Sequence, residues 1–452
     1  MFLGIDLGAT YCKVVLIDSN KNIIYSSRRR MPPPLKNRKS FIFEYDINII
    51  INTVYDIVLE IPDNQRKKVD GIGVTGQMHG IILLDSFNSP VTNYISWQDK
   101  RALDNINHSN DTYLNFIHSN LPNLKASTYT NLRPGTMGLL LFWFQEKSYL
   151  EKLKVSSAAF LSDYLVTILT GNSPACDPTN ASGSGVYELD KDGWCKDFLL
   201  LTKINESILP KIIPTGSFFG RVTYDVSNSL GLKKDTPVMV SIGDYQAALN
   251  ASGFNENQIS INVGTGAQVS VMTKNKEKFS DVYELRPYIS NKYIKCIPGL
   301  PGGRSIEVFN NFSKNFFETF SSELTDIDFL VKLEKICLQI DDDIDVVCNP
   351  RFHSIYNFIN ENAGFKNINS NNFKIENLYY SLISSLVSEY FHVSKNLNYS
   401  KKNIKEILLS GGVTHKSKLF RKILLETFKI DLKLSNSLND AAMGVATLAM
   451  RM

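Results

Sequence analysis

Two short glycine-rich segments of the chain contain residue types that can hold a phosphate group. The first, residues 3–10 (LGIDLGAT), has a carboxylate at Asp6 and a glycine at position 8, and residues 261–267 (INVGTGA) repeat the pattern with Asn262 and Gly264. A turn of small residues lets backbone N–H groups approach phosphate oxygens closely. A carboxylate at the end of the preceding strand can hold Mg²⁺, usually through water. Because only the first copy has the carboxylate, Asp6 is the candidate metal ligand.

A second repeated pattern accompanies the first. Residues 71–77 (GIGVTGQ) and 407–412 (ILLSGG) are both apolar runs that end in a small hydroxyl residue and glycine. Two matched motifs in the same order predict two homologous halves, which we place at residues 1–235 and 236–452. One loop from each half would then grip a triphosphate from both sides. The alternative is that the two loops are ordinary hairpins with glycine turns.

Strands and one short helix must position these motifs. Residues 3–7 and 14–18 predict buried strands joined by the first turn, and residues 261–263 and 269–272 repeat this arrangement. Residues 237–242 predict a strand that leads into a helix of small residues. The basic run 28–30, which precedes Met31 and three prolines, is expected to form a solvated loop. Residues 376–397 predict a helix that packs in the core, because their apolar residues recur at helical spacing.

With these motifs in this order, the chain resembles the FGGY carbohydrate kinases of the actin/hexokinase/Hsp70 superfamily over essentially its whole length. The resemblance implies two duplicated ribonuclease-H-like α/β domains with a central cleft, the sugar on the N-terminal side and the nucleotide mostly on the C-terminal side. It implies ATP and Mg²⁺ as cofactors, with the metal at Asp6. The residues that it assigns to the nucleotide are Gly8, Thr10, Lys13, Gly264, Thr265, Gly266, Gly303, Gly411 and Gly412.

The resemblance also implies a catalytic base at Asp244, within residues 241–248 (SIGDYQAA). A sugar hydroxyl is a poor nucleophile until its proton has somewhere to go, and a carboxylate within hydrogen-bond reach can accept that proton. The alternative is that Asp244 serves as the N-cap of the following helix. The two roles are compatible.

Polar residues that follow the strand at 71–76 are candidates for the sugar site. Residues 75–80 (TGQMHG) resemble ketose kinases, and they predict contacts from Gln77, Met78 and His79. Gln77 can donate and accept hydrogen bonds, and His79 can do either. The alternative for His79 is a purely structural role.

Residues 97–101 (WQDKR) keep the family's Trp-x-Asp-x-Arg pattern. Trp97 offers a flat apolar face to the C–H side of a sugar, and Asp99 can accept hydroxyl protons. Arg101 either joins them or orients Asp99. The alternative is a buried tryptophan beside a surface ion pair. Two further candidates for substrate binding are Asn180 and Tyr245.

Several segments resemble sedoheptulokinases more than xylulokinases, among them residues 162–165, 176–182 and 286–288. They predict ATP-dependent phosphorylation of sedoheptulose to sedoheptulose 7-phosphate. A pentulose such as xylulose, or another polyol, is the alternative acceptor. Two alternatives without sugar phosphorylation are a non-catalytic sugar or nucleotide sensor and an actin-like ATPase that moves partners.

Length and composition limit the classes of protein to which the chain can belong. A chain of 452 residues with 43% hydrophobic content predicts two domains. The chain has 49 Lys and Arg against 45 Asp and Glu, so it lacks the excess of basic residues that is typical of nucleic-acid-binding proteins. Six scattered cysteines without a CxxC pair predict free thiols in a reducing compartment. With no signal peptide and no apolar run long enough to span a bilayer, we expect a cytoplasmic monomer or homodimer without a membrane partner.

Overall fold

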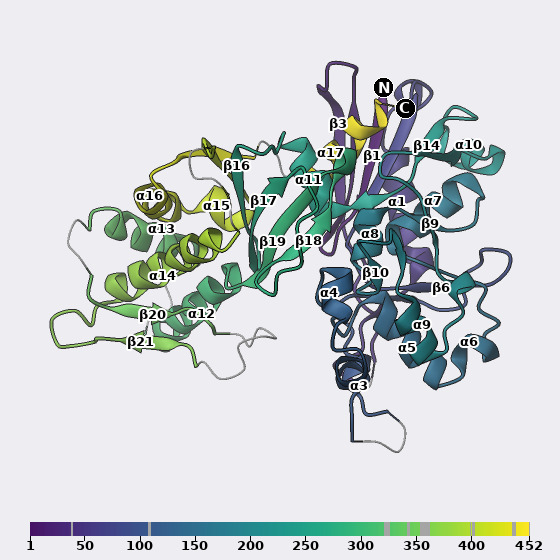
Figure 1. Ribbon diagram of the computed structural model, residues 1–452. Helices are drawn as coiled ribbons and strands as arrows, with labels where there is room; N and C mark the ends of the chain where they lie inside the picture. Colours follow the sequence, from purple (N-terminus) through teal and green to yellow (C-terminus); the bar gives the residue numbers. More distant parts are fainter. Residues whose placement is uncertain are drawn as a thin grey trace.

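The computed structural model describes residues 1–37, 39–106, 110–320, 326–340, 344–352, 362–397, 399, 403–435 and 440–451. Within these residues, two large β-sheets form the framework, each built mainly from one half of the chain (Figure 1). The predicted two-domain α/β fold is therefore confirmed.

The first sheet has the strand order β13-β14-β5-β1-β2-β3, and β15 also pairs with β5. β1 and β5 are parallel and almost completely buried, as expected for strands with helices on both faces. Their carboxyl ends therefore meet at one edge of the sheet. The strands are β1 (Phe2–Leu7), β2 (Tyr11–Ile17), β3 (Ile23–Arg30), β5 (Gly71–Gly76), β13 (Phe218–Arg221), β14 (Pro237–Met239) and β15 (Ile242–Gly243).

The second sheet has the order β18-β19-β17-β16-β22-β23. Its strands are β16 (Gln258–Val263), β17 (Ala267–Thr273), β18 (Glu284–Pro287), β19 (Tyr293–Leu300), β22 (Glu406–Ser410) and β23 (Asp431–Leu434).

The two sheets share one topology. In the first, β1 is antiparallel to β2 and parallel to β5, and in the second, β16 is antiparallel to β17 and parallel to β22. Asp6 pairs in register with Thr75, and Asn262 pairs with Ser410. The two repeated sequence patterns thus occupy equivalent places in the two sheets, which confirms the predicted duplication.

Two helices fill the space between the sheets, α11 (Asp244–Ala251) and α17 (Asp440–Ala449) (Figure 1). α17 packs against β1, β2 and β5 although it lies more than 360 residues further along the chain. This contact is close because glycines face it: a β-carbon at Gly4 would lie 1.9 Å from the carbonyl oxygen of Ala442, and one at Gly73 would lie 2.3 Å from that of Val445.

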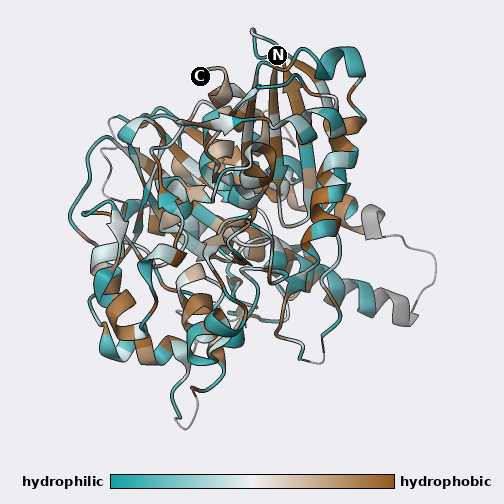
Figure 2. Cartoon of the chain, turned by 90° about the vertical axis from the view of Figure 1, so that its right-hand side faces the viewer, coloured by the Kyte–Doolittle hydropathy of each residue, from teal (hydrophilic) through white to brown (hydrophobic). Residues whose placement is uncertain are grey.

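The outer faces of the sheets are covered by helices whose buried apolar residues join the cores of the two sheets. Hydrophobic and hydrophilic residues alternate along many of the helices (Figure 2). On the first sheet the covering helices are α1 (Ile47–Leu59), α7 (Leu161–Thr170) and α10 (Tyr224–Leu230). On the second they are α12 (Gly303–Phe320), α13 (Asp326–Cys337), α14 (Ile375–Lys395) and α16 (Lys418–Phe428). α14 buries Leu382, Ile383 and Leu386, so the helix predicted over residues 376–397 is a core element as expected.

A third apolar core lies in the first half, under short elements inserted between β5 and β13. The smaller elements of the chain are α2 (Asp63–Arg66), α3 (Tyr113–Asn120), α4 (Leu124–Thr128), α5 (Met137–Glu146), α6 (Tyr149–Lys152), α8 (Pro178–Ser182), α9 (Lys196–Thr202), α15 (Gly412–Lys416), β4 (Glu44–Tyr45), β6 (Ile82–Leu84), β7 (Tyr94–Ile95), β8 (Ser157–Ala159), β9 (Ala175–Cys176), β10 (Tyr187–Glu188), β11 (Gly193–Trp194), β12 (Lys211–Ile212), β20 (Val347–Asn349), β21 (Gly364–Lys366) and the 3₁₀ turns Arg101–Leu103, Glu206–Ile208 and Ile289–Asn291.

The basic run 28–30 is not the solvated loop that its composition predicts. It is the end of β3, where Arg28 pairs with Lys13 and Arg30 pairs with Tyr11. Arg29 bonds to Asp56 and Glu60, whose carboxylates lie on and just after α1. The side chains of residues 28–30 are exposed, but their backbone forms a strand because it pairs with β2.

All six cysteines are buried free thiols. Among the described helices, none is both long and apolar enough to cross a lipid bilayer.

Candidate active site

A cavity of about 770 Å³ lies where the two halves meet. Its lining combines the turn after β1, the start of α11, the two strands that flank the turn after β16, and the segment after β22. The lining residues are Asp6, Gly8, Ala9, Thr10, Tyr11, Lys13, Asp244, Tyr245, Ala248, Asn262, Gln268, Gly411, Gly412, His415, Lys416, Asp440 and Ala441. Eight of the residues that the sequence singled out therefore border one space.

Asp6 stands at the end of β1 and is buried. The ammonium nitrogen of Lys13 lies 3.5 Å from Oδ2 of Asp6, whereas the buried Oδ1 has no hydrogen-bond partner among the described residues. Burial raises the pKa of the Asp6 carboxyl, and the positive charge of Lys13 opposes that rise. The site thus keeps one carboxylate oxygen unpaired beside the turn of small residues.

Asp244 is the first residue of α11 and follows directly on β15. The N-cap position belongs to Gly243, so the alternative of Asp244 as N-cap is wrong; its Oδ1 instead accepts a hydrogen bond from the N–H of Tyr245 at 2.7 Å. Burial raises the pKa of Asp244 to about 7, and the negative charge of Asp6 adds to the rise. A carboxyl group with this pKa can change its protonation state near neutral pH.

The second glycine turn is tied to the start of α12. The N–H of Gly303 donates to the carbonyl of Gly264 at 2.8 Å, and the N–H of Arg304 donates to that of Thr265 at 2.9 Å. A β-carbon at Gly303 would lie 2.6 Å from the same Gly264 oxygen. Gly264, Thr265, Gly266 and Gly303 are thus brought together beside the cavity, which is lined by the flanking residues Asn262 and Gln268 rather than by the turn itself.

Gln77, Met78 and His79 follow β5 and are largely buried behind the start of α11. A β-carbon at Gly243 would lie only 2.9 Å from the sulfur of Met78. Nδ1 of His79 donates to the carbonyl oxygen of Gly183. Burial, followed by the charge of Arg133, lowers the pKa of His79 to about 4, so the ring is neutral at pH 7 and its Nε2 is an acceptor.

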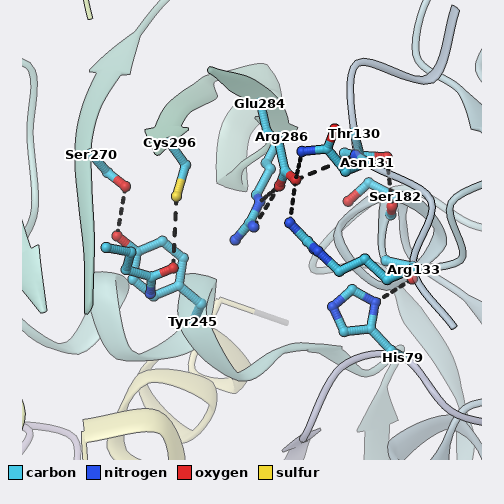
Figure 3. Close-up of polar contacts among 12 residues, drawn as sticks. His79, Thr130, Asn131, Arg133, Ser182, Tyr245, Ser270, Glu284, Arg286 and Cys296 are labelled. Carbon is cyan, nitrogen blue, oxygen red and sulfur yellow. Dashed lines mark hydrogen bonds and ion pairs between the residues drawn. The ribbon is translucent and has the colours of Figure 1, made fainter. Parts of the chain in front are cut away.

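An ion cluster that the sequence reasoning missed lies beside His79 (Figure 3). Glu284, on β18 of the second half, accepts hydrogen bonds from Arg286 at 2.6 and 2.9 Å, from Arg133 at 2.5 Å and from Asn131 at 2.9 Å. Burial acts to raise the pKa of Glu284, but the two arginines outweigh it and hold the pKa at about 2. The Glu-x-Arg spacing, which puts both side chains on one face of a strand, is the signal that could have identified half of the cluster.

Trp97, Asp99 and Arg101 divide between two environments. The Trp97 side chain is 45% exposed, so it is not the buried tryptophan of the alternative interpretation. Asp99 is fully buried and accepts hydrogen bonds from Phe43 N, Arg101 N and the Arg101 guanidinium. Arg101 also bonds to Glu44 and borders a separate cavity of about 560 Å³. Asp99 and Arg101 are therefore placed as an internal ion pair and are not brought to the cavity of Asp6 and Asp244.

Asn180 and Tyr245 are both buried next to the start of α11. Nδ2 of Asn180 donates to Oγ of Ser241 at 2.9 Å, and the Asn180 side chain is 1% exposed. The hydroxyl of Tyr245 donates to Oγ of Ser270, on β17 of the second sheet, at 2.8 Å. Tyr245 thus ties the start of α11 to the second sheet at the edge of the cavity.

Comparison with known proteins matches both halves to one family. Residues 1–250 match the N-terminal domain and residues 330–452 the C-terminal domain of the FGGY family of carbohydrate kinases. The chain is 24% identical to a xylulose kinase from Staphylococcus xylosus over 99% of this chain and 90% of that one. It is 21% identical to a sedoheptulokinase from Homo sapiens over 99% of this chain and 97% of that one. A crystal structure of gluconate kinase from Lactobacillus acidophilus has the same fold, with a TM-score of 0.83, 21% identity, and 99% and 88% of the two chains covered.

Proposed function

Because the chain belongs to the FGGY family of carbohydrate kinases, we propose that it transfers the γ-phosphoryl group of ATP to a ketose, and that the ketose is sedoheptulose. The product would be sedoheptulose 7-phosphate. The observation that carries the proposal is the common cavity: Asp6, Lys13 and the first turn face Asp244 and the segment after β22 across one space.

Asp244 is the proposed general base. With a pKa of about 7, a large fraction of its carboxyl is ionised at neutral pH, and it is also basic enough to take a hydroxyl proton as the phosphoryl group moves in line. Burial, which raises the pKa of this carboxyl, therefore suits Asp244 to act as a base near neutral pH.

The two turns are the proposed phosphate sites. Ala9, Thr10, Thr265 and Gly266 are exposed at the tips of turns that hold equivalent places in the two sheets. Lys13 would add positive charge on the side of Asp6, and Gly411 and Gly412 would contact the nucleoside. Backbone amides fixed in this way stabilise phosphoryl charge without reorganisation during the reaction.

The residues fit one Mg²⁺ ion held mainly by the substrate. Asp6 presents a buried oxygen without a partner, and within the part of the chain that the structure describes no three His, Cys, Asp or Glu side chains gather into a cage. Mg²⁺ is usually bound in this way, by one or two carboxylates together with waters and phosphate oxygens. When bound, the ion would neutralise charge on the phosphoryl oxygens.

Two observations support a ketose with many hydroxyl groups. Residues 77–79 come directly after β5 and lie against the start of α11, next to the proposed base. Beside them, the acceptor atom of neutral His79 and the guanidinium groups of Arg133 and Arg286 supply both kinds of hydrogen-bonding group (Figure 3). The segments 162–165, 176–182 and 286–288, which resemble sedoheptulokinases, favour the seven-carbon acceptor. The chain is similar to a sedoheptulokinase and to a xylulose kinase over 99% of its length, so xylulose is the second candidate.

A coupled ADP-release assay against sedoheptulose, xylulose, ribulose, glycerol and gluconate tests the acceptor. We expect the highest kcat/KM with sedoheptulose; a higher value with any other acceptor would overturn this choice. ATP turnover that is independent of every sugar would instead support the actin-like alternative.

Replacing the proposed base tests the mechanism. Asp244→Asn should leave the affinity for ATP unchanged and lower kcat by about 100-fold or more, because the amide cannot accept the hydroxyl proton. Near-normal turnover in this variant would remove Asp244 from the chemistry.

A further inference from the structure

The peptide unit that joins Ile242 to Gly243, the residue before Asp244, is held at both of its polar atoms. The carbonyl oxygen of Ile242 accepts a hydrogen bond from the hydroxyl of Thr75 at 2.7 Å. The N–H of Gly243, which belongs to the same planar unit, donates to the hydroxyl oxygen of Thr179 at 2.8 Å. Both threonines are completely buried, so water does not compete for either bond. We call this arrangement the peptide clamp.

The peptide clamp fixes the direction in which α11 begins. Because a peptide unit is planar, bonds at its oxygen and at its nitrogen together prevent it from turning about its own axis. Gly243 is the N-cap of α11, and this residue has no side chain to form a capping bond. The position of Asp244, the next residue, therefore depends on Thr75 and Thr179.

Asp177 sets the direction of the Thr179 hydrogen bonds. The hydroxyl of Thr179 donates to Oδ1 of Asp177 at 2.7 Å, which leaves its oxygen lone pairs for the N–H of Gly243. The same carboxylate accepts from the N–H of Asn180 at 2.9 Å and from the hydroxyl of Thr215 at 2.6 Å. Burial raises the pKa of Asp177 to about 6, so at pH 7 its carboxyl is mostly ionised and accepts hydrogen bonds only. In that state the chain of bonds from Gly243 through Thr179 to Asp177 has one direction.

The clamp also joins the two carboxylates of the candidate site. Thr75 lies in β5, where it pairs in register with Asp6 on one side and with Ile242 on the other. One residue therefore holds both β1, which carries the proposed metal ligand, and β15, which leads directly into the proposed base.

We infer that Thr75, Thr179 and Asp177 are positioning residues for the phosphoryl transfer, which hold the carboxylate of Asp244 where it can take the proton of the acceptor. This inference rests on the proposed function, since it requires Asp244 to be the base. It assigns a task to two threonines and an aspartate that are too deeply buried to touch a substrate.

Thr179→Val and Thr179→Ser test the inference as a matched pair. Valine keeps the volume and removes the acceptor, whereas serine keeps the hydroxyl. We expect Thr179→Val to lower kcat by about 10- to 100-fold with the KM for ATP unchanged, because a small misplacement of a reacting group is costly. Thr179→Ser should recover most of the lost turnover. The acceptor is sedoheptulose, or xylulose if the wild-type enzyme prefers it.

Thr202→Val is the control for the loss of a buried hydroxyl. Thr202 is equally buried, but its hydroxyl bonds to the carbonyl of Phe198 within α9. We expect this variant to keep its kcat and to lose thermal stability to a similar extent. If Thr179→Val does not fold, Thr75→Val replaces it, because it releases the other atom of the same peptide unit.

The outcomes separate the two proposals. A Thr179→Val or Thr75→Val variant with wild-type kcat, beside an inactive Asp244→Asn variant, would overturn the peptide clamp and leave the base in place. An active Asp244→Asn variant would overturn the proposed function itself. A kcat loss in Thr202→Val as large as that in Thr179→Val would show a general packing effect and would also count against the clamp.

Discussion

Asp6 and Asp244 line the same cavity, and the charge of Asp6 makes ionisation of Asp244 more difficult. Burial is the first cause of the raised pKa at both residues, and for Asp244 the charge of Asp6 comes next. Lys13 partly offsets this at Asp6. Two carboxylates in one partly enclosed space disfavour the doubly ionised state, so any cation bound at Asp6 also favours ionisation of Asp244.

This coupling predicts the pH dependence of the reaction. Because the proposed base must be ionised, kcat/KM should rise with pH through a midpoint near 7. Asp6→Asn removes the nearby negative charge, so the midpoint should move to lower pH while maximal activity falls. A pH–rate series on both proteins measures this, and a midpoint that stays in place would show that the two carboxylates do not interact.

Motif residues were predictable from the sequence where the backbone alone brings them together. Asp6, Asp244 and the glycines follow strands whose order is repeated, so their common location could be inferred. Glu284 and Arg133 could not, because their contact joins residues 151 positions apart on different halves. Asp99 shows a second limit: its residue type suits a sugar, but its hydrogen bonds go to Phe43 and Arg101 of the protein.

At the scale of elements, the second glycine turn, at residues 264–266, depends on the start of α12. Gly303 donates to the carbonyl of Gly264 and lies so close to it that no side chain fits between them. The turn and the helix therefore form one unit, in which the position of the turn follows from the absence of a β-carbon at residue 303.

Gly303→Ala should displace this turn and weaken nucleotide binding. We expect the KM for ATP to rise by roughly 10-fold or more, because the added methyl group must move the Gly264 backbone away from its place. Steady-state kinetics at saturating sugar measures the effect. Gly364→Ala is the control, since no atom of the described residues lies within 4 Å of a β-carbon at that position. An unchanged KM in Gly303→Ala would show that the start of α12 does not influence nucleotide binding.

Whether a segment forms a strand or a helix was easier to predict than which strand it pairs with. The strand expected over residues 237–242 is present as β14 and β15, both paired with β5. The composition of the basic run 28–30 is typical of a loop, yet the run forms a strand because it pairs with β2, a partner that composition cannot reveal. Which strands pair depends on segments that lie far apart in the chain. A single sequence indicates such pairs only where its motifs repeat.

At the scale of the whole molecule, the two halves are joined at more than their linker. α11 and α17 lie between the sheets, and on the other side of the site the N–H of Leu285 donates to the carbonyl of Tyr129 at 3.1 Å beside the Arg133–Glu284 pair. The division at residue 235 stays a prediction, since β14, β15 and α17 all contact the first sheet although they follow that residue.

The packing of α17 predicts that the first half is not stable alone. A fragment of residues 1–250 would expose the apolar face of β1, β2 and β5 that α17 covers, so we expect it to be insoluble or partly unfolded. Co-expression with residues 251–452 should increase its soluble yield. Circular dichroism and thermal denaturation measure this, and cooperative unfolding of the isolated fragment would contradict the prediction.

The same contact has a consequence for biosynthesis. β1 and β5 are complete once residue 76 has left the ribosome, but the helix that seals them ends at residue 449. At about 5–20 residues per second, a nascent chain would carry this uncovered surface for roughly 20–75 s. The face that α17 covers can therefore be buried only when synthesis is almost finished, and chaperones that shield apolar strands during elongation should influence how much protein a cell obtains.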